Sequence, residues 1–165
     1  VANVSDNSIK KEVMLQKGYD AVCYCDILGH AQQKRNTFWH KVYKHLQGIL
    51  LNRPTHVYDY SKQYKELIGE IDKDENVIPQ IVPQWDHSPR GGRKTNIYIN
   101  STPEYFAKHV RMAMEAIKGK KEEHQILMLK SWNEWAEGNY MEPDMTHGRG
   151  YIDALRQVVD EYREK

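Results

Sequence analysis

The segment that decides the fold is a short apolar run followed at once by a polar, aromatic motif, Ile126-Leu127-Met128-Leu129-Lys130-Ser131-Trp132-Asn133-Glu134-Trp135-Ala136-Glu137-Gly138. A short apolar run between polar segments is typical of a buried strand. In parallel α/β folds, polar groups that follow the carboxyl end of a strand often belong to a functional site. The sequence therefore predicts a strand over residues 125–130 and a functional turn directly after it.

Outward from this motif, strand and helix patterns alternate along the chain. Predicted strands cover residues 19–25, 55–58, 76–82 and 125–130, and predicted helices cover residues 8–17, 37–51, 61–71, 101–118 and 151–162. The helix at 101–118 has a clear start, because Ser101-Thr102-Pro103-Glu104 combines a capping-box pattern with proline in the first turn. Residues 87–100 are rich in glycine, proline and arginine, and we expect them to form a long loop.

This alternation predicts an α/β fold with a parallel sheet and helices outside it. The predicted strands end at polar or aromatic groups, namely Asp26, Asp59 with Tyr60, Trp85 with Asp86, and Glu134. Because the carboxyl ends of parallel strands meet at one edge, we expect these groups to gather there. An open doubly wound sheet fits the pattern, and so does half of a β/α barrel, since only about four units are visible and a closed barrel needs eight.

Length and composition set limits on the function. The chain has 165 residues, enough for one domain, and its 24 basic and 23 acidic residues give a net charge of +1. A balanced charge predicts neither a nucleic-acid partner nor a charged membrane surface. No apolar stretch is long enough for a membrane span, and the first residues do not form a signal peptide. The missing initiator Met suggests a processed chain or a fragment.

Metal and cofactor sites are not predicted. The eight histidines are scattered, without convincing ligand spacing. Cys23 and Cys25 are two residues apart in a predicted strand, so their side chains lie on the same face, too close in sequence for an ordinary disulfide. We interpret both as reduced core residues.

The chemistry is expected to reside in Glu134 and Glu137. Residues three apart lie on opposite faces of a strand but side by side on a helical turn, so a shared site requires a bend at Trp135-Ala136, which Gly138 permits. Carboxyl groups about 5–5.5 Å apart serve retaining glycosidases. Trp132 and Trp135 are expected to exclude water from the pair. The alternative is the start of a surface helix with solvated glutamates.

Other residues are candidates for substrate binding. Trp85 is positioned to stack on a sugar, and Asp86 to accept hydrogen bonds from hydroxyl groups; the alternative is a core tryptophan with Asp86 capping a turn. Arg90 begins a basic loop that could hold a phosphate, although a solvated loop is the alternative. Asn133 lies within the acidic motif, and Glu142 follows it in a structural or substrate-binding role.

Two motifs carry a family resemblance. Trp132 to Gly138, followed by Glu142-Pro143-Asp144 and Gly148, resembles the signature of WbsX-type proteins, and so does Trp85-Asp86-His87-Ser88-Pro89-Arg90. Those bacterial proteins are usually labelled glycosyltransferases of surface-polysaccharide (O-antigen) assembly. Their domain is similar to that of the endo-α-mannosidase (glycoside hydrolase family 99-like) enzymes.

The resemblance implies a TIM-like (β/α)8 barrel of which residues 1–165 form the C-terminal half, the N-terminal half being absent. It also implies that Glu134 deprotonates the 2-hydroxyl of a sugar to give an anhydro-sugar. Glu137 then protonates the leaving oxygen and later activates water. Such a half barrel is expected to form a homodimer or to associate with the missing half.

The sequence as a whole predicts an enzyme that acts on glycosidic bonds, as a WbsX-like glycosyltransferase in lipopolysaccharide biosynthesis. A retaining hydrolase and a non-catalytic carbohydrate-binding fragment remain alternatives. The expected partner is an oligosaccharide or an activated sugar, with no cofactor. The expected location is the bacterial cytoplasm, in association with membrane-bound polysaccharide machinery.

Overall fold

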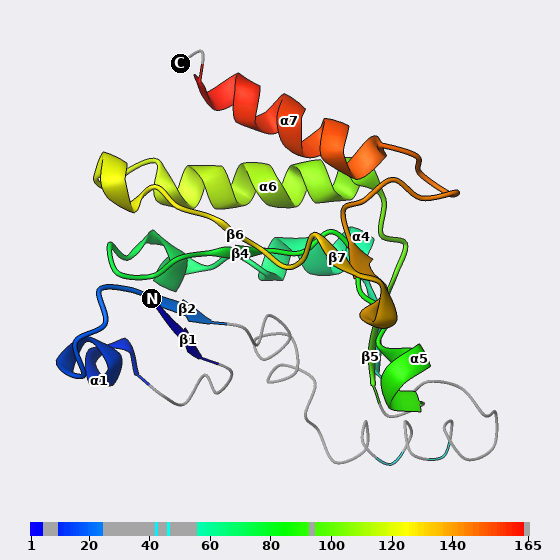
Figure 1. Ribbon diagram of the computed structural model, residues 1–165, viewed down its shortest axis with the longest axis horizontal. Helices are drawn as coiled ribbons and strands as arrows, with labels where there is room; N and C mark the ends of the chain where they lie inside the picture. The colour runs from blue at the N-terminus through cyan, green and yellow to red at the C-terminus, as the bar shows by residue number, and fades with distance from the viewer. Residues whose placement is uncertain (5–9, 25–41, 43–45, 47–55, 93–94, 164–165) are drawn as a thin grey trace.

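The computed structural model describes residues 1–4, 10–24, 42, 46, 56–92 and 95–163 as a mixed α/β fold (Figure 1). The predicted α/β class is confirmed at this level. Asp26, Cys25 and all of the predicted helix at 37–51 except residues 42 and 46 lie outside the described residues. Cys23 lies within them and is buried, as predicted for a core residue.

The strands of the central layer pair in parallel. β1 (Ala2–Val4) pairs with β2 (Val22–Tyr24), β3 (His56–Asp59) with β5 (Asn96–Ile99), and β4 (Gln80–Ile81) with β6 (Met128–Leu129). A parallel bridge between Val22 and Val77 links β2 to the segment that leads into β4. The predicted parallel arrangement is therefore confirmed, although β4 and β6 are shorter than the predicted strands.

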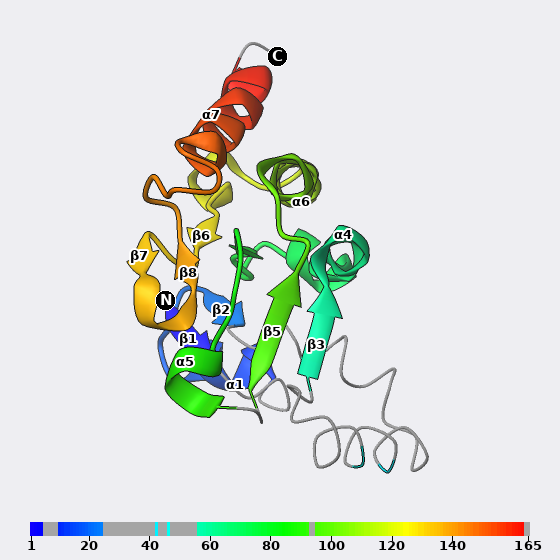
Figure 2. The same cartoon turned by 90° about the vertical axis from the view of Figure 1, so that its right-hand side faces the viewer.

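Strands β3 and β5 run side by side, with Tyr58 opposite Tyr98 (Figure 2). At the end of β3 the Asp59 carboxylate accepts a hydrogen bond from the Ser61 backbone N–H, which starts α4 (Tyr60–Gln63). The helix predicted over residues 61–71 is broken. It consists of α4, the 3-10 turns η1 (Tyr64–Glu66) and η2 (Glu70–Lys73), and an extended Gly69 between the two turns. The helix breaks at Gly69 because glycine is unfavourable in the interior of a helix.

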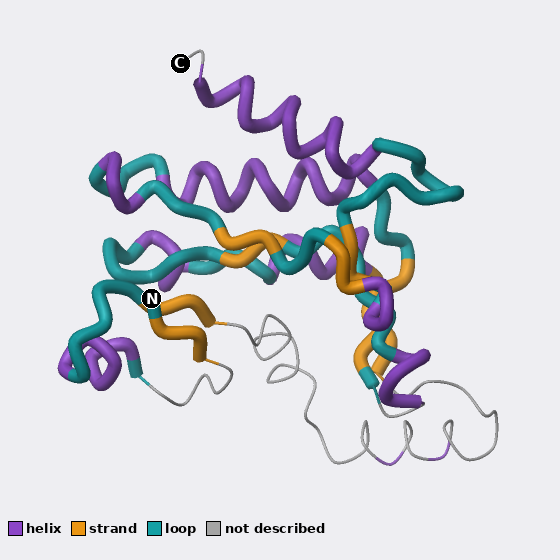
Figure 3. Tube along the Cα trace, viewed as in Figure 1, coloured by secondary structure: helices purple, strands orange, loops and turns teal. Residues whose placement is uncertain are grey.

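Helices α6 (Pro103–Ile117) and α7 (Gly150–Arg163) lie together on one side of strands β4 and β6, and we call the pair the helical layer (Figures 1 and 3). Both helices were predicted from the sequence. The Thr102 hydroxyl caps α6 by accepting a hydrogen bond from the Tyr105 N–H, with Pro103 as its first residue. The layer packs on a cluster of buried side chains formed by Ile81, Phe106, Ala107, Val110, Ala113, Met141, Tyr151 and Val158.

One polar contact is buried between the helical layer and α4. The Tyr60 hydroxyl donates to the Val82 carbonyl at 2.6 Å, which leaves its oxygen 3.0 Å from Nδ1 of His109. His109 is completely buried, and burial lowers its pKa to about 4. The imidazole is therefore neutral at physiological pH.

The predicted long loop over residues 87–100 is the main error. It contains the short helix α5 (Ser88–Gly91) and the strand β5. Four strand residues next to turn-forming glycines give a weak sequence signal. The extended conformation is stabilised by pairing with β3 and by an antiparallel bridge between Asp86 and Ile97. The strand β1 was also missed. The remaining short helix, α1 (Lys11–Gln16), lies within the predicted range 8–17.

Candidate active site

The polar motif after β6 folds into a tight hairpin. Strand β7 (Asn133–Glu134) pairs antiparallel with β8 (Asn139–Tyr140), and the 3-10 turn η5 (Trp135–Glu137) joins them through Gly138. Gly138 has φ +53°, the left-handed conformation that glycine adopts at little cost. We call residues 133–140 the acid-bearing turn.

The two glutamates approach a common partner. Glu134 ends β7 and Glu137 ends η5, and both carboxylates lie near the Arg90 guanidinium. The Arg90 Nη1 atom is 4.0 Å from Oε1 of Glu134 and 3.2 Å from Oε1 of Glu137. Because both distances are measured from one nitrogen, the two carboxylate oxygens are at most about 7 Å apart. This limit allows the carboxyl separation of about 5–5.5 Å that retaining glycosidases use.

The two glutamates differ in their exposure. The Glu137 side chain is 17% exposed and the Glu134 side chain 42% exposed, while the Arg90 side chain above them is 60% exposed. A guanidinium that contacts both carboxylates offsets their mutual repulsion. Arg90 therefore lies against the acidic pair. The sequence pattern had instead suggested a phosphate as the partner of its loop.

The second tryptophan-containing motif, residues 85–90, contacts the acid-bearing turn directly. The Asp86 N–H donates to the Glu137 carbonyl at 3.0 Å, and His87 Nε2 lies 3.4 Å from Glu137 Oε1. The Asp86 carboxylate accepts from the N–H and the hydroxyl of Ser88, at 2.9 and 2.5 Å. Asp86 thus caps a turn, which was the alternative interpretation of this residue, and the turn places His87 and Arg90 beside Glu137.

Trp85 lies mainly within the core. It packs against a cluster that includes Tyr58 and Tyr98, and the Lys130 ammonium lies 4.3 Å from the centre of its ring. Among the described residues its buried indole N–H has no hydrogen-bond partner. A ring covered by Lys130 has little surface left for a sugar, so the structure favours the packing role over the predicted stacking role.

Trp132 and Trp135 are instead half exposed, at 49% and 48%. Their exposure lends no support to the expectation that both rings exclude water from the glutamates, which stays a prediction. Trp135 stacks on Tyr140, with ring centres 3.7 Å apart and planes inclined by 14°, and its indole N–H donates to Glu142 at 2.6 Å. Asn133 is exposed. Burial, with a smaller contribution from Asp144, raises the pKa of the Tyr140 hydroxyl, so that this hydroxyl stays protonated at neutral pH.

Sequence reasoning missed three residues of this region, His87, Asn139 and Tyr140. Asn139 is completely buried and its amide N–H groups donate to the carbonyls of Gln84 and Lys130, while its side-chain oxygen accepts from the Ser131 hydroxyl. For Asn139, the signal available in the sequence was a polar residue directly after Gly138, a residue suited to a tight turn. His87 was visible inside the second motif but had no obvious partner in the sequence.

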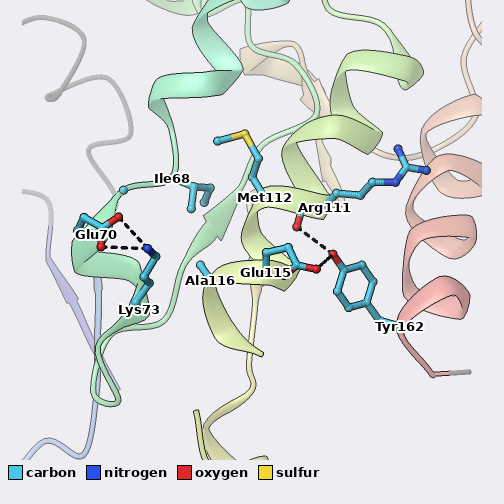
Figure 4. Close-up of a pocket in the computed structure, with 9 residues that line it drawn as sticks. Ile68, Glu70, Lys73, Arg111, Met112, Glu115, Ala116 and Tyr162 are labelled. Carbon is cyan, nitrogen blue, oxygen red and sulfur yellow. Dashed lines mark hydrogen bonds and ion pairs between the residues drawn. The ribbon is translucent and has the colours of Figure 1, made fainter. Parts of the chain in front are cut away.

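A separate pocket of about 660 Å³ lies between η2 and the helical layer (Figure 4). It is lined by Ile68, Gly69, Glu70, Lys73, Arg111, Met112, Glu115, Ala116 and Tyr162. Its charged side chains are already engaged, since Lys73 pairs with Glu70 and the Tyr162 hydroxyl donates to Glu115. None of the predicted site residues lines this pocket.

Two further findings concern metals and membranes. Within the described ranges, no three His, Cys, Asp or Glu side chains are grouped so that they could hold a metal ion. The helices of the described part of the chain are too short or too polar to cross a lipid bilayer.

Comparison with known proteins gives the class and then the family. The class is that of carbohydrate-active enzymes: the matching family model is that of glycosyltransferase WbsX, and it covers residues 2–155. The chain belongs to this WbsX glycosyltransferase family. The resemblance expected from the two tryptophan-containing motifs is thereby confirmed.

Two curated relatives are similar over part of the chain. One is an uncharacterized protein WxcX of Xanthomonas campestris pv. campestris (strain B100), 29% identical over 104 residues, covering 62% of this chain and 15% of the relative. The other is WxcX of a second strain of that organism, 30% identical over 101 residues, covering 58% of this chain and 14% of the relative. The matched region thus spans about one seventh of the curated relatives. No solved structure matches the chain significantly.

Proposed function

We propose that this chain carries the two-glutamate site of an enzyme that makes or breaks glycosidic bonds during the synthesis of a bacterial surface polysaccharide. The observation that carries the proposal is the acid-bearing turn, in which Glu134 and Glu137 both approach Arg90. Membership of the WbsX glycosyltransferase family supports the carbohydrate class. Lipopolysaccharide is the polysaccharide that we propose, because the two tryptophan-containing motifs resemble those of WbsX-type proteins of O-antigen assembly.

In this proposal the more exposed carboxylate, Glu134, removes the proton from the 2-hydroxyl of the donor sugar. The resulting alkoxide attacks the anomeric carbon and gives an anhydro-sugar. Glu137, held by the Asp86–Arg90 segment, protonates the leaving oxygen as its bond to the anomeric carbon breaks. In the second half Glu137 takes the proton from the acceptor hydroxyl, whose oxygen attacks the anomeric carbon and opens the anhydro ring. Glu134 gives its proton back to the 2-oxygen, which restores both glutamates.

Transfer and hydrolysis differ in the acceptor, which is a sugar hydroxyl in one case and water in the other. Because the Glu134 side chain is 42% exposed, either acceptor can approach the pair. A retaining endo-mannosidase-like hydrolase is therefore the second candidate function, because it needs the same two carboxylates. Trp132, Asn133 and Trp135 are exposed around the pair and are proposed to contact the glycan.

The test is the variant Glu137→Gln, which keeps the shape of the side chain but removes its proton chemistry. We expect turnover of manno-configured oligosaccharides or of nucleotide sugars to fall by about 10²–10⁴-fold, with sugar binding intact. Glu123→Gln, on an exposed turn outside the site, is the matched control. Undiminished turnover in the Glu137 variant would end the proposal.

We further propose that the chain forms the C-terminal half of a β/α barrel and associates with a second copy or with the other half. The parallel strands and the gathering of Asp86, Arg90 and Glu137 beyond them support this arrangement. Sedimentation of the chain tests it. Dimers or larger species are expected, whereas a stable monomer of 19.5 kDa would favour a self-contained fold.

A further inference from the structure

Trp135 and Tyr140 form a flat aromatic pair at the surface, which we call the Trp135–Tyr140 platform. Their ring centres are 3.7 Å apart and their planes nearly parallel, at 14°. Tyr140 covers one face of the indole, and yet Trp135 is still 48% exposed. The opposite face of the indole is therefore accessible to a ligand.

The platform is held in place from two directions. The antiparallel pairing of β7 and β8 fixes the backbone on both sides of it, with Asn133 opposite Tyr140. Glu142 accepts the indole N–H at 2.6 Å, a short hydrogen bond to a charged acceptor. Rotation of the indole would break this bond and the stack together, so the ring is pre-oriented.

The platform lies beside the glutamates and not between them. The indole of Trp135 contacts Tyr140 and Glu142, whereas the carboxylates of Glu134 and Glu137 approach Arg90, so the two features have separate partners on the turn. A ligand that spans both features must extend across the surface of the turn. A single sugar ring placed at the glutamates would not cover the indole.

We propose that the Trp135–Tyr140 platform binds the sugar ring next to the one whose bond reacts, so that the enzyme acts on glycan chains and discriminates against single sugars. The apolar C–H face of a pyranose ring packs on an aromatic face, which suits a neutral glycan. Glu142 is then a positioning residue that acts through Trp135. This inference rests on the proposed function for the location of the reacting bond.

The experiment is an NMR titration of the 165-residue chain with a manno-configured monosaccharide and tetrasaccharide, and with gluco-configured sugars of the same lengths. The four indole N–H resonances are assigned with single Trp→Phe variants. The tetrasaccharide is expected to shift the Trp135 resonance and to bind about tenfold more tightly than the monosaccharide. Trp135→Ala should abolish this dependence on length.

Variants of Glu142 separate positioning from direct contact. Glu142→Ala is expected to weaken tetrasaccharide binding several-fold, and Glu142→Gln to restore most of it, because the amide oxygen still accepts the indole N–H. Tyr19→Ala, which removes an exposed aromatic ring outside the site, is the control and should bind like the unmodified chain.

Two outcomes would overturn the inference: a Trp135 resonance that none of the sugars shifts, and a tetrasaccharide that binds no better than the monosaccharide. Failure of the proposed function looks different. In that case the tetrasaccharide binds at Trp135, but Glu134→Gln and Glu137→Gln leave turnover unchanged.

Discussion

The helical layer and the acid-bearing turn are built by opposite means. Helices α6 and α7 meet over completely buried apolar side chains such as Phe106, Val110 and Val158, and charged pairs such as Arg111–Glu161 lie at the rim. The acid-bearing turn has few buried apolar groups. It is held by hydrogen bonds from Asn139, by the Asp86–Glu137 backbone contact and by the stacked rings of Trp135 and Tyr140.

The difference teaches where stability and chemistry reside. Apolar burial supplies most of the folding free energy and tolerates no unpaired charge, so the helical layer is expected to dominate global stability. Hydrogen bonds contribute less net free energy, but they fix the orientation of the groups that they join. A functional site needs side chains in fixed orientations. Changes in the helical layer should therefore unfold the chain, whereas changes in the acid-bearing turn should alter the site and cost less stability.

Acidification is expected to have the largest effect, through His109 in the helical layer. Its folded pKa of about 4 lies below the ordinary value of 6.5, because burial disfavours the charged imidazole. Between these values the unfolded chain binds a proton and the folded chain does not. The contribution of His109 is thus fully present above pH 6.5 and is lost as the pH falls towards 4, by up to about 3 kcal/mol.

Urea denaturation between pH 7 and pH 4 measures this loss, and His109→Asn identifies the group responsible. The variant is expected to lose much of the pH dependence in this window. A direct check that does not depend on the variant is the NMR titration of the His109 ring in the folded protein. If that ring titrates near pH 6.5, burial in the helical layer does not govern its charge.

A smaller global effect is expected from Gly138→Ala in the acid-bearing turn. A Cβ there would lie 3.0 Å from the Asp86 backbone nitrogen, and φ is +53°. We expect a loss of about 1–2 kcal/mol in the free energy of unfolding, together with a shifted Trp135 indole resonance.

Gly119→Ala provides the matched control for this substitution, because no atom lies within 4 Å of its added Cβ. Its effect should stay within about 0.5 kcal/mol. Equal losses in the two variants would show that the turn is not as closely packed against Asp86 as the structure indicates.

Sequence patterns predicted the elements that carry strong local signals. The capping residues of α6 and the apolar stripe of α7 gave both helices nearly to their ends. Strand β5 was missed because its Asn96–Ile99 segment becomes extended by pairing with β3, a contact between residues far apart in the sequence. Gly69 marked the break in the helix after Tyr60, but the apolar spacing around it concealed the signal.

For the site, spacing alone indicated that Glu134 and Glu137 need a bend to meet. The partners that hold them were not predictable in the same way. Arg90 and His87 come from a segment about 50 residues earlier, and only the folded chain places them beside Glu137. Glu142 likewise reached Trp135 through a return of the chain that no local pattern specifies.

The buried amide of Asn139 has a consequence for how a ligand is received. It joins the segment ending at Gln84, the strand end at Lys130 and the hydroxyl of Ser131 in one set of hydrogen bonds. The backbone of the acid-bearing turn is thereby anchored when the protein folds. If the proposed function holds, little of the affinity for a glycan is consumed in ordering this turn, which favours rapid capture over slow rearrangement.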